Sequence, residues 1–347
     1  MSYSMKAALL YGPKDLRIEE QEMPTVGDNE VLLRVQRGGI CGSDLHFYET
    51  GRSGAYVVTT PLVLGHEFSG TVADIGNAVK NLSKGDRAVV EPSFPCFRCK
   101  YCKRGRYNLC PDLVFCGVPN VHGALREYTV VPSDFVYPIP GQMSLEEGAM
   151  IEPLAVGLYA VQRAGVNPGD RVAVLGGGPI GLLTLEAALA VGAAEVYVTD
   201  HHDIRLEVAK ELGATACINT LKQNAVEEIH RLTRGEKVDV VVEAVGAPAT
   251  IQEAFKIVSP GGTIVVVGVF AQPEISTEIG RLAENEVEVK GARLYPGIFK
   301  GAIRLASKKA VQLTPLISKT FDFDRVEEAF EAARNKDETI KVQVRIE

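Results

Sequence analysis

One short stretch restricts the possible folds of this chain more than any other. The apolar run Val172–Leu175 leads directly into the sequence GGGPIG, and a helical pattern follows over 182–191. In such a unit Gly176 permits the tight turn, Gly178 lets the backbone approach a pyrophosphate, and Gly181 allows the helix to pack against the strand. The stretch therefore predicts a parallel α/β sheet that binds a dinucleotide at the N-terminus of a helix.

The end of the next predicted strand indicates which dinucleotide is bound. The run Glu195–Thr199 ends in Asp200, at the spacing where a carboxylate accepts hydrogen bonds from the adenosine ribose. This residue favours NAD over NADP, because it repels a 2′-phosphate, although Arg205 and the histidines at 201 and 202 leave NADP open. The alternative is a glycine-rich loop with an ordinary aspartate at a strand end. Agreement between the strand, the loop, the helix and the acidic residue argues against that alternative.

The pattern of apolar runs divides the chain into two parts. Up to about residue 150, short β-like runs between glycines and prolines predict a mainly β domain, with strands over 30–35, 68–75 and 87–91. From Arg171 onward, apolar runs alternate with helical stretches and predict a doubly wound parallel sheet of six strands, near 171–175, 195–199, 216–218, 238–242, 263–267 and 287–291. Two helices, over 297–310 and 325–334, and a strand over 340–346 follow, and we expect them to return to the first domain.

Four cysteines within fifteen residues predict a metal site. Their spacing, Cys96-x2-Cys99-x2-Cys102-x7-Cys110, supplies the four thiolates of a closed tetrahedral zinc site, so we expect a structural role. Four thiolates around Zn²⁺ leave a charge of −2, which accounts for five nearby cations at 98, 100, 103, 104 and 106. The alternatives are a nucleic-acid-binding zinc module and a set of disulfides.

A second set of candidate ligands lies on two segments of the β domain that we expect to be loops. The segments 38–46 and 65–67 bring thiol, imidazole, carboxylate and hydroxyl groups together. Taken singly, a buried cysteine or histidine is more often part of a core than a ligand. Together with a hydride-accepting cofactor they fit alcohol oxidation, which requires a Lewis acid and a path for the proton. Asp44 is a candidate partner of one ligand.

Charge and hydropathy exclude several other classes of protein. The 347 residues carry 37 Lys and Arg against 44 Asp and Glu, and the net charge of −7 disfavours a nucleic-acid or anionic-membrane partner. The longest apolar runs, such as 263–270, have the length of a strand and fall short of the roughly 18–20 residues of a membrane span. The apolar run after Lys6 is too short for the core of a signal peptide, so we expect a cytoplasmic protein.

Several stretches resemble the zinc-containing medium-chain dehydrogenase/reductases, and within them the sorbitol (L-iditol) dehydrogenase branch, in the microbial form that keeps the cysteine lobe. The resemblance spans essentially the whole chain. It rests on the sequence over 39–70, GRYNLCPD at 105–112, IEPLAVG at 151–157, GGGPIGLLTL at 176–185 and VTDHHDIRL at 198–206.

The resemblance implies a fold and a place for the active site. A GroES-like, mainly β catalytic domain would comprise residues 1–153 and 292–347 and carry both zincs, one catalytic and one structural. A Rossmann domain would comprise residues 154–291, with the active site in the cleft between the two. The family also implies a homo-oligomer, a tetramer or a dimer, with the strand Val287–Gly291 and the segment after it at subunit contacts.

Individual roles follow from the same resemblance. Cys41, His66 and Glu67 are implied as ligands of the catalytic zinc, and Glu152 as the residue that holds the metal-bound water or joins the ligands. Alcohol-dehydrogenase relatives place a cysteine where Glu152 stands, which favours a polyol substrate. The remaining roles are a proton relay through Ser43 and His46, and NAD contacts from Ile180, Asp200 and Arg205.

The substrate pocket is where the chain departs from the family pattern. Its candidates are Phe47, Phe115, Arg293 and Tyr295, but sorbitol dehydrogenases typically read Phe-Arg-Tyr where this chain reads Arg293-Leu294-Tyr295. A shift of one residue in a strand turns a side chain to the other face, so Arg293 does not simply replace the family's arginine.

The expected reaction is reversible oxidation of a secondary hydroxyl of a polyol, of the sorbitol, iditol or xylitol type, to a ketose with NAD. One alternative is a dehydrogenase of another small secondary alcohol, such as a vicinal diol, a sugar acid or L-threonine. The other is a non-catalytic, crystallin-like structural protein.

Overall fold

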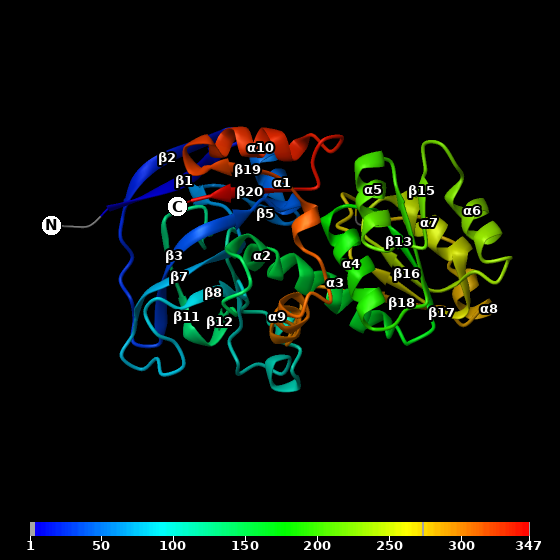
Figure 1. Ribbon diagram of the computed structural model, residues 1–347, viewed down its shortest axis with the longest axis horizontal. Coiled ribbons are helices and arrows are strands. Elements are labelled where there is room, and N and C mark those ends of the chain that lie inside the picture. Colours follow the sequence, from blue (N-terminus) through cyan, green and yellow to red (C-terminus); the bar gives the residue numbers. More distant parts are fainter. Residues whose placement is uncertain (1–3, 273, 347) are drawn as a thin grey trace. The chain divides into compact units, whose positions relative to one another are not determined.

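The computed structural model describes residues 4–272 and 274–346, which form two compact units (Figure 1). The first contains the described residues up to Glu152, with Phe299–Lys308 and the chain from Ile317 onward; the second contains Pro153–Ile298 and Lys309–Leu316. Residues 153, 292–298 and 309–316 thus group with the second unit, whereas the sequence-based boundaries assign them to the first.

The first unit is built on sheets whose strands come from both ends of the chain. The largest has the order β12-β8-β7-β3-β20-β19, with β11 also paired to β3. Its strands are β3 (Glu30–Gly39), β7 (Glu67–Ile75), β8 (Arg87–Val90), β11 (Tyr128–Pro132), β12 (Val136–Pro138), β19 (Ile317–Asp322) and β20 (Lys341–Arg345). A second sheet has the order β2-β1-β6, and comprises β1 (Ser4–Gly12), β2 (Asp15–Glu22) and β6 (Leu62–Val63). Two small hairpins pair β4 (Arg52–Ser53) with β5 (Tyr56–Val57) and β9 (Ser93–Phe94) with β10 (Val114–Phe115).

Helices complete the first unit and share its core. They are α1 (Gly42–Thr50), α2 (Leu145–Ala149), α9 (Phe299–Ser307) and α10 (Val326–Arg334), while α3 (Ile151–Ala164) begins in this unit and continues into the second. Tyr48 of α1 packs against Phe330 of α10 with ring centroids 5.0 Å apart, inside an apolar cluster that includes β1, β3 and β20.

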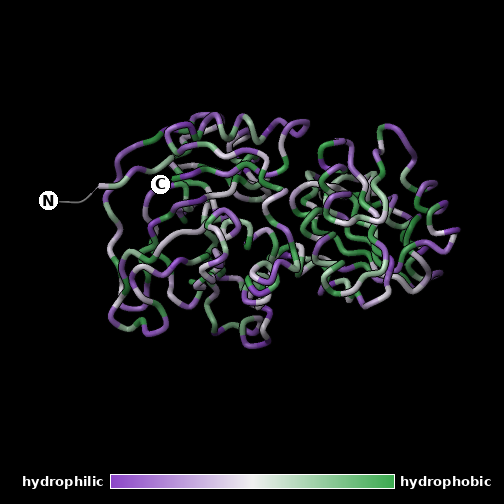
Figure 2. Tube along the Cα trace, viewed as in Figure 1, coloured by the Kyte–Doolittle hydropathy of each residue, from purple (hydrophilic) through white to green (hydrophobic). Residues whose placement is uncertain are grey.

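The second unit is a parallel sheet covered by helices. The order of its six described strands is β15-β14-β13-β16-β17-β18, all parallel. The strands are β13 (Arg171–Leu175), β14 (Glu195–Asp200), β15 (Ala216–Asn219), β16 (Val238–Glu243), β17 (Val258–Val266) and β18 (Glu288–Gly291). Figure 2 shows apolar residues concentrated in the interior of this unit, as expected for strands buried on both faces.

The helices that follow the first strand of this sheet are α4 (Pro179–Ala190), α5 (Asp203–Glu211), α6 (Ala225–Leu232), α7 (Pro248–Ile257) and α8 (Gly280–Glu284). Helix α4 contacts α5, and helix α6 contacts α7. Gly181 is required where α4 crosses β13, because a Cβ atom there would collide with the carbonyl oxygen of Gly176. The predicted mainly β domain and doubly wound sheet of six parallel strands are confirmed.

One prediction about local structure is wrong. The segment after Gly39 is not a loop throughout, because residues 42–50 form α1. Its start is stabilised by a side chain whose role was not anticipated: the Asp44 carboxylate accepts a hydrogen bond from the backbone N–H of Cys41, at 3.0 Å. Similarly, Glu67, predicted to lie on a loop, is the first residue of β7.

No helix among the described residues is long and apolar enough to cross a membrane.

A buried carboxyl group on α4 affects the stability of the second unit. Glu186 is 5% exposed; its Oε1 accepts a hydrogen bond from the backbone N–H of Gln312, and its Oε2 has no hydrogen-bond partner among the described residues. Burial raises the pKa of Glu186 to about 7. The native chain therefore keeps a proton that the unfolded chain releases near its ordinary pKa of 4.5.

We predict that stability falls as pH rises from about 4.5 through 7, by on the order of 3 kcal/mol from this group. Glu186→Gln removes the buried charge, so its midpoint of thermal unfolding should exceed that of the wild type by about 5 °C at pH 8 and by little at pH 5. Glu207→Gln, at an exposed position on α5, is the control. Equal differences at the two pH values would contradict the assignment.

Candidate functional site

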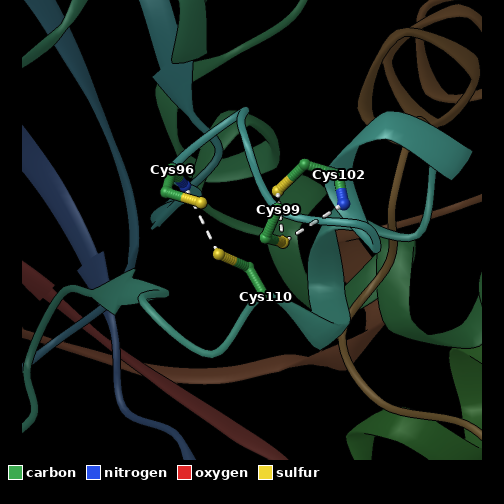
Figure 3. A group of neighbouring side chains, drawn as sticks. All are labelled: Cys96, Cys99, Cys102 and Cys110. Carbon is green, nitrogen blue, oxygen red and sulfur yellow. Dashed lines mark hydrogen bonds between the residues drawn. The ribbon is translucent and has the colours of Figure 1, made fainter.

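The four cysteines of the first unit form one compact cluster. The sulfur atoms of Cys96, Cys99, Cys102 and Cys110 all lie within 4.8 Å of one another and face a common centre (Figure 3). The sulfurs of Cys99 and Cys102 are 3.5 Å apart, much farther than the roughly 2.05 Å of a disulfide. Zinc–sulfur bonds of about 2.3 Å give a tetrahedron with edges of about 3.8 Å, so the donor set fits this ion.

Local backbone structure holds the cluster ready for a cation. The N–H of Cys96 points to the sulfur of Cys110 at 3.4 Å, and the N–H of Cys102 points to the sulfur of Cys99 at 3.5 Å. This second contact is the main reason that the pKa of Cys99 is lowered to about 7, which favours its thiolate. Burial acts in the opposite direction on two of the other thiols, raising the pKa of Cys102 to about 12 and also that of Cys110. A left-handed Gly105 (φ 71°) ends the 3₁₀ turn η1 (Cys102–Arg104) and reverses the chain toward Cys110.

The cysteine lobe is tied to the sheet through a buried carboxylate. The hydroxyl of Tyr107 donates to Glu91 Oε1 at 2.6 Å, and the hydroxyl of Tyr137 donates to Oε2 at 3.1 Å. Glu91 is 1% exposed and follows β8 directly. The five predicted cations of the lobe, at 98, 100, 103, 104 and 106, are all exposed.

A second cluster forms where β3 and β7 meet. Cys41 Sγ, a His66 ring nitrogen and a Glu67 carboxylate oxygen lie within 4.8 Å of one another. The register pairs Gly39 with Glu67, so the end of β3 delivers the thiol beside the start of β7. Gly39 is needed at this point, because a Cβ atom would collide with the Glu67 carboxylate. A thiol, an imidazole and a carboxylate are the donor types that zinc takes in open sites.

Asp44 organises this second cluster. It is 1% exposed; one oxygen accepts from the N–H of Cys41 and the other from the N–H of Gly65 at 3.2 Å and lies 3.6 Å from His66 Nδ1. Burial raises the pKa of Asp44. Burial disfavours a charged His66, but Asp44 and Cys41 outweigh this effect and hold its pKa well above the ordinary value. The contact at Nδ1 leaves Nε2 as the free donor atom of the imidazole.

A lysine that the sequence did not reveal also contacts this cluster. Lys341 Nζ lies 2.7 Å from each oxygen of Glu67 and donates to the carbonyl oxygen of Ile40 at 3.1 Å. The lysine is 3% exposed and the glutamate 1%. Burial disfavours the charged lysine, but Glu67 and Cys41 raise its pKa above the ordinary value.

The other candidate catalytic residues of the first unit, Ser43, His46 and Glu152, differ in their exposure to solvent. Ser43 is half-buried and His46 exposed, three residues apart on α1, so both lie on one side of that helix. Glu152, in the first turn of α3, is 6% exposed and helps to raise the pKa of His66 and Lys341, but it lies outside the compact trio of donor atoms.

The candidates for the substrate pocket are divided between the units. Phe115 packs on His66 with ring centroids 5.1 Å apart, and Phe47 is 2% exposed in the core beneath α1. Arg293 is exposed and Tyr295 is fully buried, and both belong to the second unit. The structure thus brings Phe115 to the second cluster.

The predicted nucleotide loop has the required local geometry. Gly176 has a φ of 103°, and Gly178 precedes α4, whose first residues are Pro179 and Ile180, without a side-chain cap. Because glycine has no side chain that could cap the helix, the backbone N–H groups at the start of α4 suit a phosphate group.

Asp200 ends β14 beside this loop and is 8% exposed. Its carboxylate accepts from the N–H of Gly177 at 2.8 Å and from the N–H of His202 at 2.9 Å. Arg205 pairs with the same carboxylate at 3.2 Å, while its buried Nε has no hydrogen-bond partner in the described chain.

Comparison with known proteins agrees with both units. Residues 27–141 match the alcohol dehydrogenase GroES-like domain, and residues 179–308 match the zinc-binding dehydrogenase family. The sorbitol dehydrogenase of Bacillus subtilis (strain 168) is 41% identical over 342 residues, which cover 98% of this chain and 97% of that protein.

Solved structures share the whole fold. L-idonate 5-dehydrogenase from Escherichia coli has a TM-score of 0.93 at 30% identity and covers 100% of this chain, which covers 99% of it. A zinc-binding dehydrogenase from Sinorhizobium meliloti bound to NADP has a TM-score of 0.92 at 32% identity, with 99% and 100% covered. With matches that extend over nearly its full length, the chain belongs to the zinc-containing medium-chain dehydrogenase/reductase family.

Proposed function

We propose that the protein reversibly oxidises a secondary hydroxyl of a polyol to a ketose, with NAD as the hydride acceptor. The observation that carries this proposal is the trio of half-buried Cys41 with buried His66 and Glu67, which gathers three zinc donors within 4.8 Å of one another. Since zinc in catalytic sites takes three protein ligands, substrate would supply the fourth. The relative named sorbitol dehydrogenase supports a polyol as the substrate. So does Glu152, which stands where alcohol-dehydrogenase relatives have a cysteine.

Residues of the chain would perform distinct tasks in this reaction. The trio would hold zinc, with Glu152 nearby. When bound, the zinc would supply the Lewis acid that lowers the pKa of the substrate hydroxyl, and NAD would supply the hydride acceptor. Asp44 orients the His66 ring through Nδ1. Ser43 and His46 would carry the released proton outward, and the half-buried position of Ser43 and the exposure of His46 support this path.

We assign a structural zinc to the four cysteines. Their closed set of sulfur donors leaves no position for a substrate, and Tyr107 fixes the lobe to buried Glu91. The exposed cations of the lobe offset the negative charge of four thiolates around one ion.

Two serine variants separate the roles of the metals. Cys41→Ser should lose one zinc per chain and nearly all turnover while it remains folded, because the structural cluster is intact. Cys99→Ser should lose the other zinc and mainly lower the midpoint of thermal unfolding. Zinc content by elemental analysis and turnover with NAD are the measurements. Cys217→Ser, at a cysteine outside both clusters, is the matched control. Full activity in Cys41→Ser would refute the catalytic site.

NAD is proposed as the cofactor because Asp200 places a carboxylate at the loop. The carboxylate is held in place by the N–H groups of Gly177 and His202, where it would repel a 2′-phosphate. Arg205 beside it, with a free Nε, is the feature that favours NADP, the dinucleotide bound in the Sinorhizobium meliloti relative.

Turnover of a panel of secondary alcohols with each dinucleotide tests both substrate and cofactor. We expect a polyol such as sorbitol, iditol or xylitol to give the highest kcat/KM, with NAD preferred. Asp200→Ala should narrow or reverse that preference, whereas Asp203→Ala, which removes an exposed carboxylate three residues along, should leave it unchanged. A wild type that prefers NADP would overturn the cofactor assignment.

The same panel tests the alternative substrates. A sugar acid is the second candidate, because one structural relative is named L-idonate 5-dehydrogenase. Vicinal diols and L-threonine belong in the panel as other small secondary alcohols. Absence of turnover with every alcohol would instead favour a crystallin-like structural role, against which the complete set of donors argues.

We also propose a homotetramer in the cytoplasm. The edge strand β18 exposes Val289 by 44%, and Ile279 before it is 63% exposed, which supports burial of this edge against another subunit. Seven unpaired cysteines suit a reducing compartment. Sedimentation at micromolar concentration should show a species of about four times the chain mass of 37.4 kDa, or two times for a dimer. A monomer alone would refute the assembly.

A further inference from the structure

A buried ion pair joins Lys341 of β20 to Glu67 of the trio. Both partners are almost fully enclosed, and the ammonium group contacts both carboxylate oxygens at 2.7 Å. Burial of two charges is costly, and such a pair is often replaceable by apolar residues without loss of stability. A role beyond stability is therefore indicated.

The position of the ammonium group suggests that role. Lys341 comes from the last strand, where the N–H of Ile40 donates to the carbonyl of Val342 at 3.0 Å, one residue before Cys41. The lysine thus lies beside the very carboxylate that completes the trio of donors. A metal at the trio and Lys341 would draw on the same oxygens of Glu67.

We propose that Lys341 is a positioning residue that shares the Glu67 carboxylate with the catalytic zinc, so that Glu67 remains a weak and exchangeable ligand. This inference rests on the catalytic zinc site proposed above. Its cause is electrostatic: the lysine withdraws electron density from both oxygens and adds one positive charge beside the cation. Without the lysine, both oxygens of Glu67 would be available to the metal, and the carboxylate would bind it more firmly.

The direction of the effect distinguishes this role from a merely structural one. In Lys341→Met, release of zinc to a chelator should slow by about tenfold or more, because a neighbouring cation has been removed. A structural role predicts the opposite, faster loss from a loosened site. In the cobalt-substituted protein, the visible absorption bands should change, since they report the ligand geometry.

Turnover gives a second readout. In Lys341→Met, a firmly bound Glu67 would leave the metal less accessible to substrate and the site less positive. The kcat of this variant should therefore fall by about tenfold or more, while its KM for NAD stays unchanged. Lys341→Arg keeps the charge and should restore metal release and most of kcat. Lys319 lies on the adjacent strand β19 and forms an exposed ion pair with Glu338. Lys319→Met removes that pair and should behave like the wild type.

Lys341→Gln keeps the test decisive if Lys341→Met does not fold, because it retains a hydrogen-bond donor beside Glu67 and removes the charge alone. A structural role predicts metal release at the wild-type rate or faster. The proposal instead predicts slower release and a changed cobalt spectrum in this variant too, because the neighbouring cation is lost. Faster zinc loss in Lys341→Met, or wild-type behaviour of either variant, would overturn the inference. A wild type that binds no zinc at the trio would contradict the proposed function itself.

Discussion

The pairing of β3 with β7 is the constraint on which the first unit depends. Its register sets Gly39 opposite Glu67, and the absence of a side chain at Gly39 leaves room for the carboxylate. The chain leaves β3 at Cys41 and enters α1, and Asp44 of that helix returns to hold the N–H groups of Cys41 and Gly65. A shift of this register by one residue would move Glu67 to the other face of the sheet and dismantle the trio.

Electrostatic balance distinguishes the two clusters. The cysteine lobe gathers four thiol donors, and its cations at 98, 100, 103, 104 and 106 stay in solvent, where they offset charge cheaply. The carboxylate of the trio is buried, where a solvated cation cannot reach it. This carboxylate has a buried counter-ion, Lys341, supplied by the far end of the chain. This difference fits a static role for one site and exchange of ligands at the other.

The sequence reveals what is encoded by local spacing. The six parallel strands, the four-cysteine lobe and the glycine loop follow from periodicity and from the needs of tight turns and metals. Lys341 was missed because Ile340, Val342 and Val344 alternate with polar residues, a pattern that normally marks a strand with one solvated face. Both faces of β20 are buried here, and only the tertiary fold shows that the lysine has a carboxylate to meet. The helix α1 was missed because its start is capped by Asp44, a residue considered only as a partner of a ligand.

Anomalous X-ray scattering at the zinc absorption edge, from crystals of the protein purified with its metal, tests the central claim most directly. The account predicts two peaks per chain, one among the sulfurs of the four cysteines and one among Cys41, His66 and Glu67. A peak at the four cysteines alone would contradict it, if the same crystals bind substrate and NAD and show no metal at the trio.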